Sequence, residues 1–230
     1  MQTHSLFPTV VGEDFFGNND YTKQLVLETY FEKCNEDGYS NENTGHVDIH
    51  LDPRYESLYL QITNSINKYL ANMAIMPGMY DVNVVKSWFN VTREADTPKH
   101  DHPEAHYSFV YYVNHPDDVA KSLVLHNDFP TANEPHGAFF SNNVFEWNHS
   151  NAYSWNLMPK EGTLYVFPAK LQHSTSGETE STATGNSPNR TKEDLLKKRI
   201  SIAGDVVLTH KEVSTKPTGL QPVSNWKTFR

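Results

Sequence analysis

A succession of short strand-like runs fills the second half of the chain and constrains its fold more than any other feature. Each run is rich in β-branched and aromatic residues, which is typical of β-strands. The runs lie at residues 82–91, 107–114, 121–127, 162–168 and 199–209. Since no helical pattern of comparable strength separates them, they favour an antiparallel sandwich or barrel over a parallel α/β fold.

One stretch ahead of these runs has the periodicity of an amphipathic helix. Between Arg54 and Met73, apolar residues recur at spacings of three and four, which puts them on one helical face. They are Leu58, Ile62, Ile66, Tyr69 and Leu70. A helix with one apolar face is expected to pack on a sheet. The predicted fold class is therefore α+β, mainly β, with a covering N-terminal helix.

The length of 230 residues and a hydrophobic content of 37% suit a single domain, residues 1–230. Residues 174–198 begin as Ser/Thr/Gly low complexity and end in a basic run, which predicts a flexible insertion with a helical turn at its end. Residues 130–162 are rich in turn residues yet aromatic, so either a hairpin that packs its rings on the core or a substrate-facing lid is expected. Residues 211–230 form a predicted C-terminal tail.

The charge balance excludes some partners. A formal net charge of -9 and a pI near 5.7 argue against binding to nucleic acid or to an anionic membrane, both of which need clustered basic residues. The N-terminus lacks the features of a signal peptide, and no apolar run approaches the roughly 18 residues of a membrane span. A single cysteine, Cys34, fits a reducing compartment. We expect a cytoplasmic protein, with its oligomeric state left open.

The densest concentration of metal-ligating residue types is the segment "HDHPEAH", residues 100–106. In an extended chain His100, His102 and Glu104 share one face, and a pair at i and i+2 can chelate one ion. A further ligand must come from a distant segment, and His173 is the candidate because it follows a strong strand. Histidines suit several transition metals, and a carboxylate beside them suits Fe(II). For the spacing alone, surface histidines that bind no metal are the simpler interpretation.

Five segments taken together, in order, resemble a family of 2-oxoglutarate- and Fe(II)-dependent oxygenases that is common in bacteria and phages and is related to the prolyl hydroxylases. The resemblance runs from about Leu6 to Val207. Its segments are "SLFPTVV", "KSWFNVTREADTPKHDHPEAHYSFVYYVN", "LVLHNDFP", "EGTLYVFPAKLQHS" and "RISIAGD". The resemblance implies a double-stranded β-helix, or jelly-roll, with Fe(II) as cofactor and 2-oxoglutarate as cosubstrate. It also implies the host cytoplasm as the location if the protein is phage-encoded.

The resemblance also implies a set of metal ligands. The family holds Fe(II) with two histidines and usually with an aspartate or glutamate in an HxD/E pattern. His100 matches the first histidine and His173 the distal one, whereas His102 stands where the wider superfamily keeps its carboxylate. Three interpretations remain open: His102 is the third ligand, which we favour; Glu104 replaces it; or water fills the position. No catalytic residue is expected beyond the metal ligands.

A second set of residues is implied for the cosubstrate. Arg199 matches the arginine that pairs with the distal carboxylate of 2-oxoglutarate, and Ser201 is the second position of the same RxS pattern. Strand alternation puts both on one face, where a guanidinium and a hydroxyl can meet one carboxylate. Tyr112 and Asn90 match two further cosubstrate contacts of related hydroxylases.

The implied activity is that of a dioxygenase that uses O₂ to hydroxylate an unidentified substrate, with release of succinate and CO₂. A peptidyl residue such as proline and a small molecule are both substrates of relatives. Two other interpretations stay open. The histidines can belong to a cupin-like metal enzyme, or the chain can be a non-catalytic jelly-roll with a binding or structural role.

Overall fold

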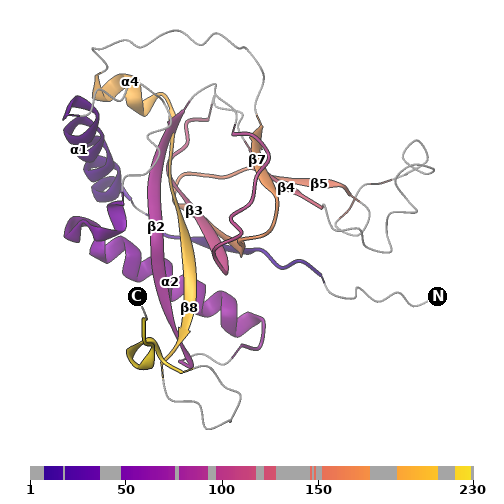
Figure 1. Cartoon of the computed structure of the whole chain (residues 1–230). Coiled ribbons are helices and arrows are strands. Elements are labelled where there is room, and N and C mark those ends of the chain that lie inside the picture. The colour runs from indigo at the N-terminus through magenta and orange to yellow at the C-terminus, as the bar shows by residue number, and fades with distance from the viewer. Residues whose placement is uncertain are drawn as a thin grey trace.

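Two antiparallel β-sheets lie face to face in the computed structural model, with helices on the outer side of the larger sheet (Figure 1). The structure describes residues 8–17, 19–36, 48–75, 78–92, 97–117, 122–127, 146, 148, 152–176, 191–211 and 221–228. The strands are β1 (Gly12–Phe15), β2 (Tyr80–Thr92), β3 (Tyr107–Asn114), β4 (Ser122–His126), β5 (Ser154–Leu157), β6 (Thr163–Pro168), β7 (His173–Ser176) and β8 (Arg199–His210). The helices are α1 (Asp20–Glu36), α2 (Glu56–Asn72) and α4 (Lys192–Leu196), with short 3-10 turns η1 (Ile49–Leu51), η2 (Pro53–Tyr55) and η4 (Val223–Asn225).

The strand order is that of a jelly-roll. The larger sheet runs β1-β6-β3-β8-β2 and the smaller one β5-β4-β7, and each pairing is antiparallel. Residues 97–100 add an irregular fourth member beside β7. They pair with it through a bridge between His100 and His173 and through a hydrogen bond from Thr175 N to Thr97 O of 3.1 Å. This arrangement confirms the predicted mainly β jelly-roll.

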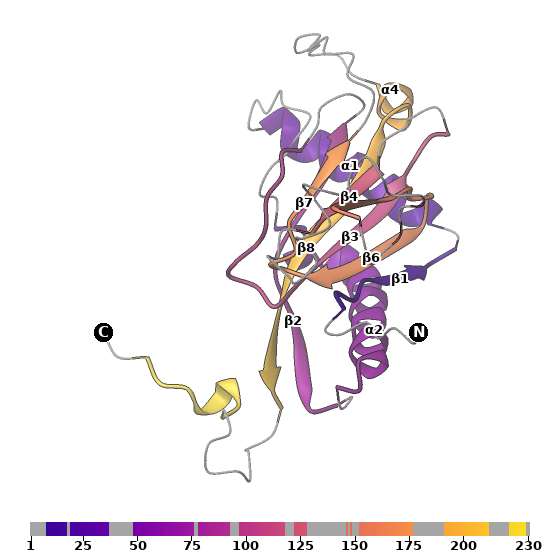
Figure 2. The same cartoon turned by 90° about the vertical axis from the view of Figure 1, so that its right-hand side faces the viewer.

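The predicted helix is confirmed as α2, and its apolar face packs on the larger sheet. Leu58, Ile62 and Ile66 are at most 5% exposed and share one core cluster with Phe89 and Ile202 of the sheet. Figure 2, turned by 90°, shows the helices behind the strands of this sheet. Among the described residues no helix combines the length and the apolar run that a membrane crossing requires.

A second covering helix, α1, was not predicted. Its sequence, DYTKQLVLETYFEKCNE, buries the consecutive residues Leu25, Val26 and Leu27 together with Tyr30, rather than a stripe with helical spacing. Burial of consecutive residues gives a weak periodic signal. The formation of α1 therefore depends more on tertiary packing against the sheet than on the hydrophobic periodicity of its sequence.

The five predicted strands are present, and three short ones were not expected: β1, β5 and β7, each of four residues. Strand β5 lies inside the 130–162 segment and pairs with β4, so this segment does contain one arm of a hairpin. Tyr153, beside this strand, is 52% exposed rather than packed on the core. Trp155, within β5, is half-buried, and the other aromatic residues of the segment lie outside the described residues: Phe139, Phe140, Phe145 and Trp147.

The predicted insertion at 174–198 is described only at its two ends. Its first residues continue β7, and its last ones form α4, which agrees with the expected helical turn. The side chain of Thr191 caps this helix by accepting a hydrogen bond from Asp194 N at 3.2 Å. Residues 177–190 lie outside the described residues.

Strand β8 is an inner strand of the larger sheet, paired on one side with β2 and on the other with β3, and it carries three side chains of the cavity described below: Arg199, Ser201 and Asp205. Ile200 and Ile202 belong to the core under the helices, and the alternate positions face the space between the sheets. Gly204 is required at its position, since an added Cβ would lie 2.5 Å from the Phe109 ring and 2.8 Å from Lys86 O. The strand is thereby fixed against its neighbours.

Candidate metal centre

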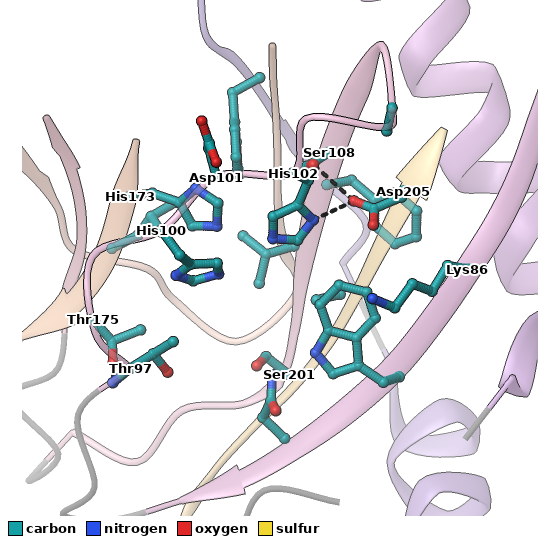
Figure 3. A pocket seen from close by; sticks show the side chains of 18 of the residues that line it. Lys86, Thr97, His100, Asp101, His102, Ser108, His173, Thr175, Ser201 and Asp205 are labelled. Carbon is teal, nitrogen blue, oxygen red and sulfur yellow. Dashed lines mark hydrogen bonds and ion pairs between the residues drawn. The ribbon is translucent and has the colours of Figure 1, made fainter. Parts of the chain in front are cut away.

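Three histidines from separate parts of the sequence meet at the edge of a cavity between the sheets. One ligand atom from each of His100, His102 and His173 lies within 4.8 Å of the other two. His100 and His173 are linked by two backbone hydrogen bonds of 3.0 and 2.8 Å. Figure 3 shows the three rings close together. The structure thus brings together the three favoured metal ligands.

The local backbone differs from the extended segment that the sequence predicts. Only His100 pairs in β fashion, through its bridge to His173, and the chain turns at Pro103 and Glu104. Glu104 is exposed and lines the cavity rim, but it does not belong to the cluster. The His100, His102 and His173 triad is the only group of potential metal ligands found within the described residues.

The orientation of the three rings suits one shared ion. His100 Nδ1 lies 2.7 Å from Pro98 O, and His173 Nδ1 lies 2.9 Å from Leu171 O. Because a carbonyl only accepts, each Nδ1 carries the proton and donates, which leaves the lone pair of Nε2 available. His102 Nδ1 lies 2.5 Å from Asp205 Oδ1 and leaves Nε2 available in the same way. The donor set therefore fits a transition metal such as Fe(II).

Burial keeps one of these ligands in its metal-binding form. His173 is 8% exposed. Loss of hydration lowers the pKa of its imidazole to about 4, with a smaller opposing effect from the hydrogen bond to Leu171. The ring is consequently neutral at physiological pH, and a neutral imidazole is the form that coordinates a metal.

Asp205, which holds the His102 ring through a hydrogen bond, was not predicted from the sequence. Asp205 is 6% exposed and accepts hydrogen bonds from His102 Nδ1 and, at 2.9 Å, from Ser108 Oγ. The alternation that selects Arg199 and Ser201 on β8 reaches Asp205 four residues after Ser201. Strand alternation therefore pointed to Asp205 as a cavity residue, but nothing in the sequence indicates that it lies beside His102, 103 positions away.

The four residues expected to bind the cosubstrate line the same cavity as the triad. The cavity has a volume of about 740 Å³. Asn90, Ser201 and Tyr112 form one cross-strand row over β2, β8 and β3, and Arg199 lies two residues earlier on β8. The structure thus places Arg199, Ser201, Tyr112 and Asn90 together.

Arg199, Ser201, Tyr112 and Asn90 form one wall of the cavity, and the electrostatics of this wall suit a carboxylate. Arg199 is 2% exposed, so its guanidinium lies buried in this wall of the cavity. Burial raises the pKa of Tyr112 to about 12, against a smaller opposite effect of the Arg199 charge. The phenol therefore stays protonated and can donate. A buried guanidinium beside hydroxyl donors is an arrangement that binds planar anions.

An aromatic residue that was not predicted lines the cavity next to the triad. The Trp88 ring stacks on the His102 ring with 5.6 Å between centroids, and Lys86 Nζ lies 5.0 Å from the Trp88 ring. Both residues are on β2, an edge strand of the larger sheet. They line the part of the cavity that lies farther from Arg199 along strands β2 and β8.

Known proteins support this interpretation of the site. Residues 86–184, which include the triad, match the model of a family described as "Putative 2OG-Fe(II) oxygenase". Comparison with curated protein sequences finds no match.

Among solved structures, the chain is similar to the non-heme alpha ketoglutarate dependent carbocyclase SnoK from nogalamycin biosynthesis. The TM-score is 0.52 at 10% identity, over 88% of this chain and 82% of that one. For a prolyl-4-hydroxylase from Pseudomonas putida the TM-score is 0.48 at 13% identity, and the match covers 86% of this chain and 87% of that one. A 2OG-Fe(II) oxygenase family oxidoreductase from Burkholderia pseudomallei gives 0.42 at 13% identity; the match covers 68% of this chain and 59% of that one.

The likeness to SnoK bears on the fold alone, and it agrees with the jelly-roll described above. The family match bears on the activity, because it spans the segment that carries the histidines. Fe(II) and 2-oxoglutarate are the cofactor and cosubstrate that this family implies, and the histidine triad fits the metal. Over residues 86–184 the chain is therefore similar to the family of 2-oxoglutarate- and Fe(II)-dependent oxygenases.

Proposed function

We propose that this enzyme hydroxylates its substrate in a reaction that converts 2-oxoglutarate and O₂ into succinate and CO₂. One oxygen atom of O₂ enters succinate and the other forms the new hydroxyl, so that R–H becomes R–OH. The observation that carries the proposal is the presence, in one cavity, of a histidine triad with free Nε2 positions and of the buried guanidinium of Arg199.

The histidines are the proposed metal ligands. His100, His102 and His173 each engage Nδ1 with a protein acceptor, so each ring is already turned for coordination through Nε2. Fe(II), when bound with 2-oxoglutarate, supplies the activation of O₂ and the removal of hydrogen from the substrate. Three protein ligands leave coordination positions open for the cosubstrate and for O₂.

Arg199 is the proposed anchor for the distal carboxylate of 2-oxoglutarate. The hydroxyls of Ser201 and Tyr112 line the same wall and can donate to the same group, and Asn90 continues their row on β2. Because the site is buried, these charge-assisted hydrogen bonds compete little with water. Binding at this wall fixes which end of the cosubstrate points toward the triad.

The substrate is a peptidyl residue such as proline, or a small molecule, that enters the part of the cavity beside Trp88. A cavity of about 740 Å³ leaves room for a second molecule, because 2-oxoglutarate has only ten non-hydrogen atoms. Trp88 and Lys86 are positioned to contact that second molecule. Enclosure of the reacting carbon between Trp88, Lys86 and the triad limits access of water to that carbon and keeps other C–H bonds away from the metal.

A turnover experiment tests the proposal. Fe(II)-loaded protein is incubated with 2-oxoglutarate and O₂, and succinate and CO₂ are quantified. Succinate is expected to form in a 1:1 ratio to the 2-oxoglutarate consumed. His173→Ala should abolish its formation, whereas His210→Ala, which removes a histidine from the far end of β8, should not. Absence of succinate from fully metal-loaded wild-type protein would contradict the proposal and favour a cupin-like or non-catalytic jelly-roll.

A further inference from the structure

The triad differs from the ligand set of the wider superfamily, because His102 stands where a carboxylate is usual. Three neutral imidazoles leave the full charge of a divalent ion uncompensated by protein ligands. A carboxylate does lie next to the triad, one hydrogen bond away, in the form of Asp205. Figure 3 shows Asp205 beside His102, with Ser108 on the same carboxylate.

The three imidazoles are not equivalent in their surroundings. His100 and His173 donate to the backbone carbonyls of Pro98 and Leu171, which are neutral. Only His102, of the three, donates to a carboxylate. A histidine that donates to a carboxylate is fixed in one tautomer and one ring orientation, and its other nitrogen becomes a stronger base toward a metal.

The position of Asp205 is fixed by the larger sheet. Asp205 is in register with Ser108 on β3 and with Lys86 on β2, where the pairing shifts by one residue between Val84 and Lys86. The Ser108 hydroxyl donates to the same oxygen, Oδ1, that accepts from His102. Gly204, immediately before it, is held by contacts that admit no side chain. The carboxylate is therefore a rigid, buried acceptor directed at His102.

We propose that Asp205 is a positioning residue of the metal centre, which supplies through His102 the negative charge that a directly bound carboxylate supplies in HxD/E relatives. This inference deepens the proposed function and rests on its metal site. In this arrangement His102 and Asp205 together replace the usual carboxylate ligand. Removal of the charge weakens metal binding even where the hydrogen bond can still form.

The competing explanation is a purely structural role, in which Asp205 joins β8 to β3 through Ser108 and affects the site only through the fold. The two explanations differ in one respect. A positioning role depends on the presence of His102, whereas a structural role does not. A double-mutant cycle between positions 102 and 205 measures this dependence directly.

The experiment uses Co(II) as the probe, so that it requires neither O₂ nor 2-oxoglutarate. Co(II) dissociation constants are measured for the wild type, Asp205→Asn, His102→Asp and the double variant. Asp205→Asn is expected to weaken binding about 10- to 100-fold, the usual effect of removing such a partner. In the His102→Asp background, the same substitution should cause no loss, because the metal then has its own carboxylate.

A control and a second readout separate charge from fold. Ser108→Ala removes the other hydrogen bond to Asp205 but leaves the His102 contact, and its Co(II) affinity is expected to stay within about 3-fold of wild type. The visible ligand-field bands of bound Co(II) should shift in Asp205→Asn and not in Ser108→Ala. These bands report the metal environment even if His102→Asp does not fold.

Two results would overturn the inference: wild-type Co(II) affinity and spectrum in Asp205→Asn, or an equal loss from that substitution in both backgrounds. Failure of the proposed function has a different signature. In that case wild-type protein would bind Co(II) with the expected dependence on Asp205 but would not convert 2-oxoglutarate to succinate.

Discussion

At the scale of single residues, the wall of the cavity combines a buried cation with hydroxyl donors. Tyr112 is 1% exposed and in register with Ser201, while Arg199 begins the same strand as Ser201. Burial of the phenol raises the pKa of Tyr112 to about 12, so it acts as a donor throughout the physiological range. Its neighbour Tyr111 points to the opposite face, where its ring lies 5.1 Å from that of Phe16.

Tyr112→Phe is predicted to weaken binding of 2-oxoglutarate to the metal-loaded protein. Loss of one hydrogen bond to a charged group costs about 1.5–3 kcal/mol, so the dissociation constant should rise about 10- to 100-fold. Anaerobic titration calorimetry with 2-oxoglutarate measures it. Tyr111→Phe is the matched control and should leave this constant unchanged. Equal effects of the two substitutions would argue against Tyr112 as a cosubstrate contact.

The buried imidazole of His173 is predicted to make the metal-free protein sensitive to acid. Its pKa is about 4 in the folded protein and 6.5 as a reference value for the unfolded chain. Between these values the unfolded state binds more protons, so stability falls as the pH decreases from about 6.5 to 4, by an amount on the order of 3 kcal/mol. Urea unfolding of wild type and His173→Asn over this range measures the effect. Parallel pH profiles for the two proteins would contradict the prediction.

Much of the site at this scale could be predicted from the sequence, but only where local spacing or the resemblance supplied a pattern. His100, His102 and His173 were selected in this way, and the structure brings them together. The hydrogen bond between His102 and Asp205 joins positions 103 residues apart. Neither residue's local sequence encodes that pairing, which depends on where the 100–106 segment lies relative to β8.

At the scale of secondary structure, an element could be predicted from the sequence where its buried residues recur at regular spacing. Helix α2 buries residues with helical spacing and was predicted, whereas α1 buries consecutive residues and was not. Long strands such as β2 and β8 gave clear runs of β-forming residues. Strands β5 and β7 have four residues each and depend on pairing with β4 for their existence. Their formation is decided by tertiary contacts that a local pattern does not report.

Helix α2 offers a matched test of how much its apolar face contributes to stability. Leu58 is 5% exposed and belongs to the core, whereas Leu60 is 58% exposed on the same helix. Leu58→Ala is predicted to lower the free energy of unfolding by about 2–5 kcal/mol, and Leu60→Ala by no more than about 0.5 kcal/mol. Urea denaturation of both variants measures the difference. Similar losses would show that α2 does not pack as described.

At the scale of the whole molecule, the triad connects the two sheets. His173 belongs to the smaller sheet through β7, and His102 is held to the larger sheet by its hydrogen bond to Asp205 on β8. His100 joins the irregular segment 97–100 to β7. A bound ion would therefore crosslink the two sheets through side chains that belong to each of them.

Metal binding is predicted to stabilise the whole domain against unfolding. A ligand that binds only the folded state, at 100 times its dissociation constant, adds about 2.7 kcal/mol. Co(II) should raise the unfolding midpoint of wild type and of His210→Ala but not that of His173→Ala, and a chelator should reverse the effect. Stabilisation of His173→Ala to the wild-type extent would place the metal elsewhere.

In the proposed site one cavity holds both the metal and 2-oxoglutarate, with Arg199 as the anchor of the cosubstrate. The most direct measurement is anaerobic: Fe(II)-loaded protein is titrated with 2-oxoglutarate, and the weak visible charge-transfer band of the chelated cosubstrate is recorded. A band is expected in wild type and in the control variant Arg54→Lys, whose arginine is exposed, whereas Arg199→Lys should require a much higher concentration of 2-oxoglutarate. Absence of the band in fully metal-loaded wild-type protein would show that 2-oxoglutarate does not chelate a metal in this cavity.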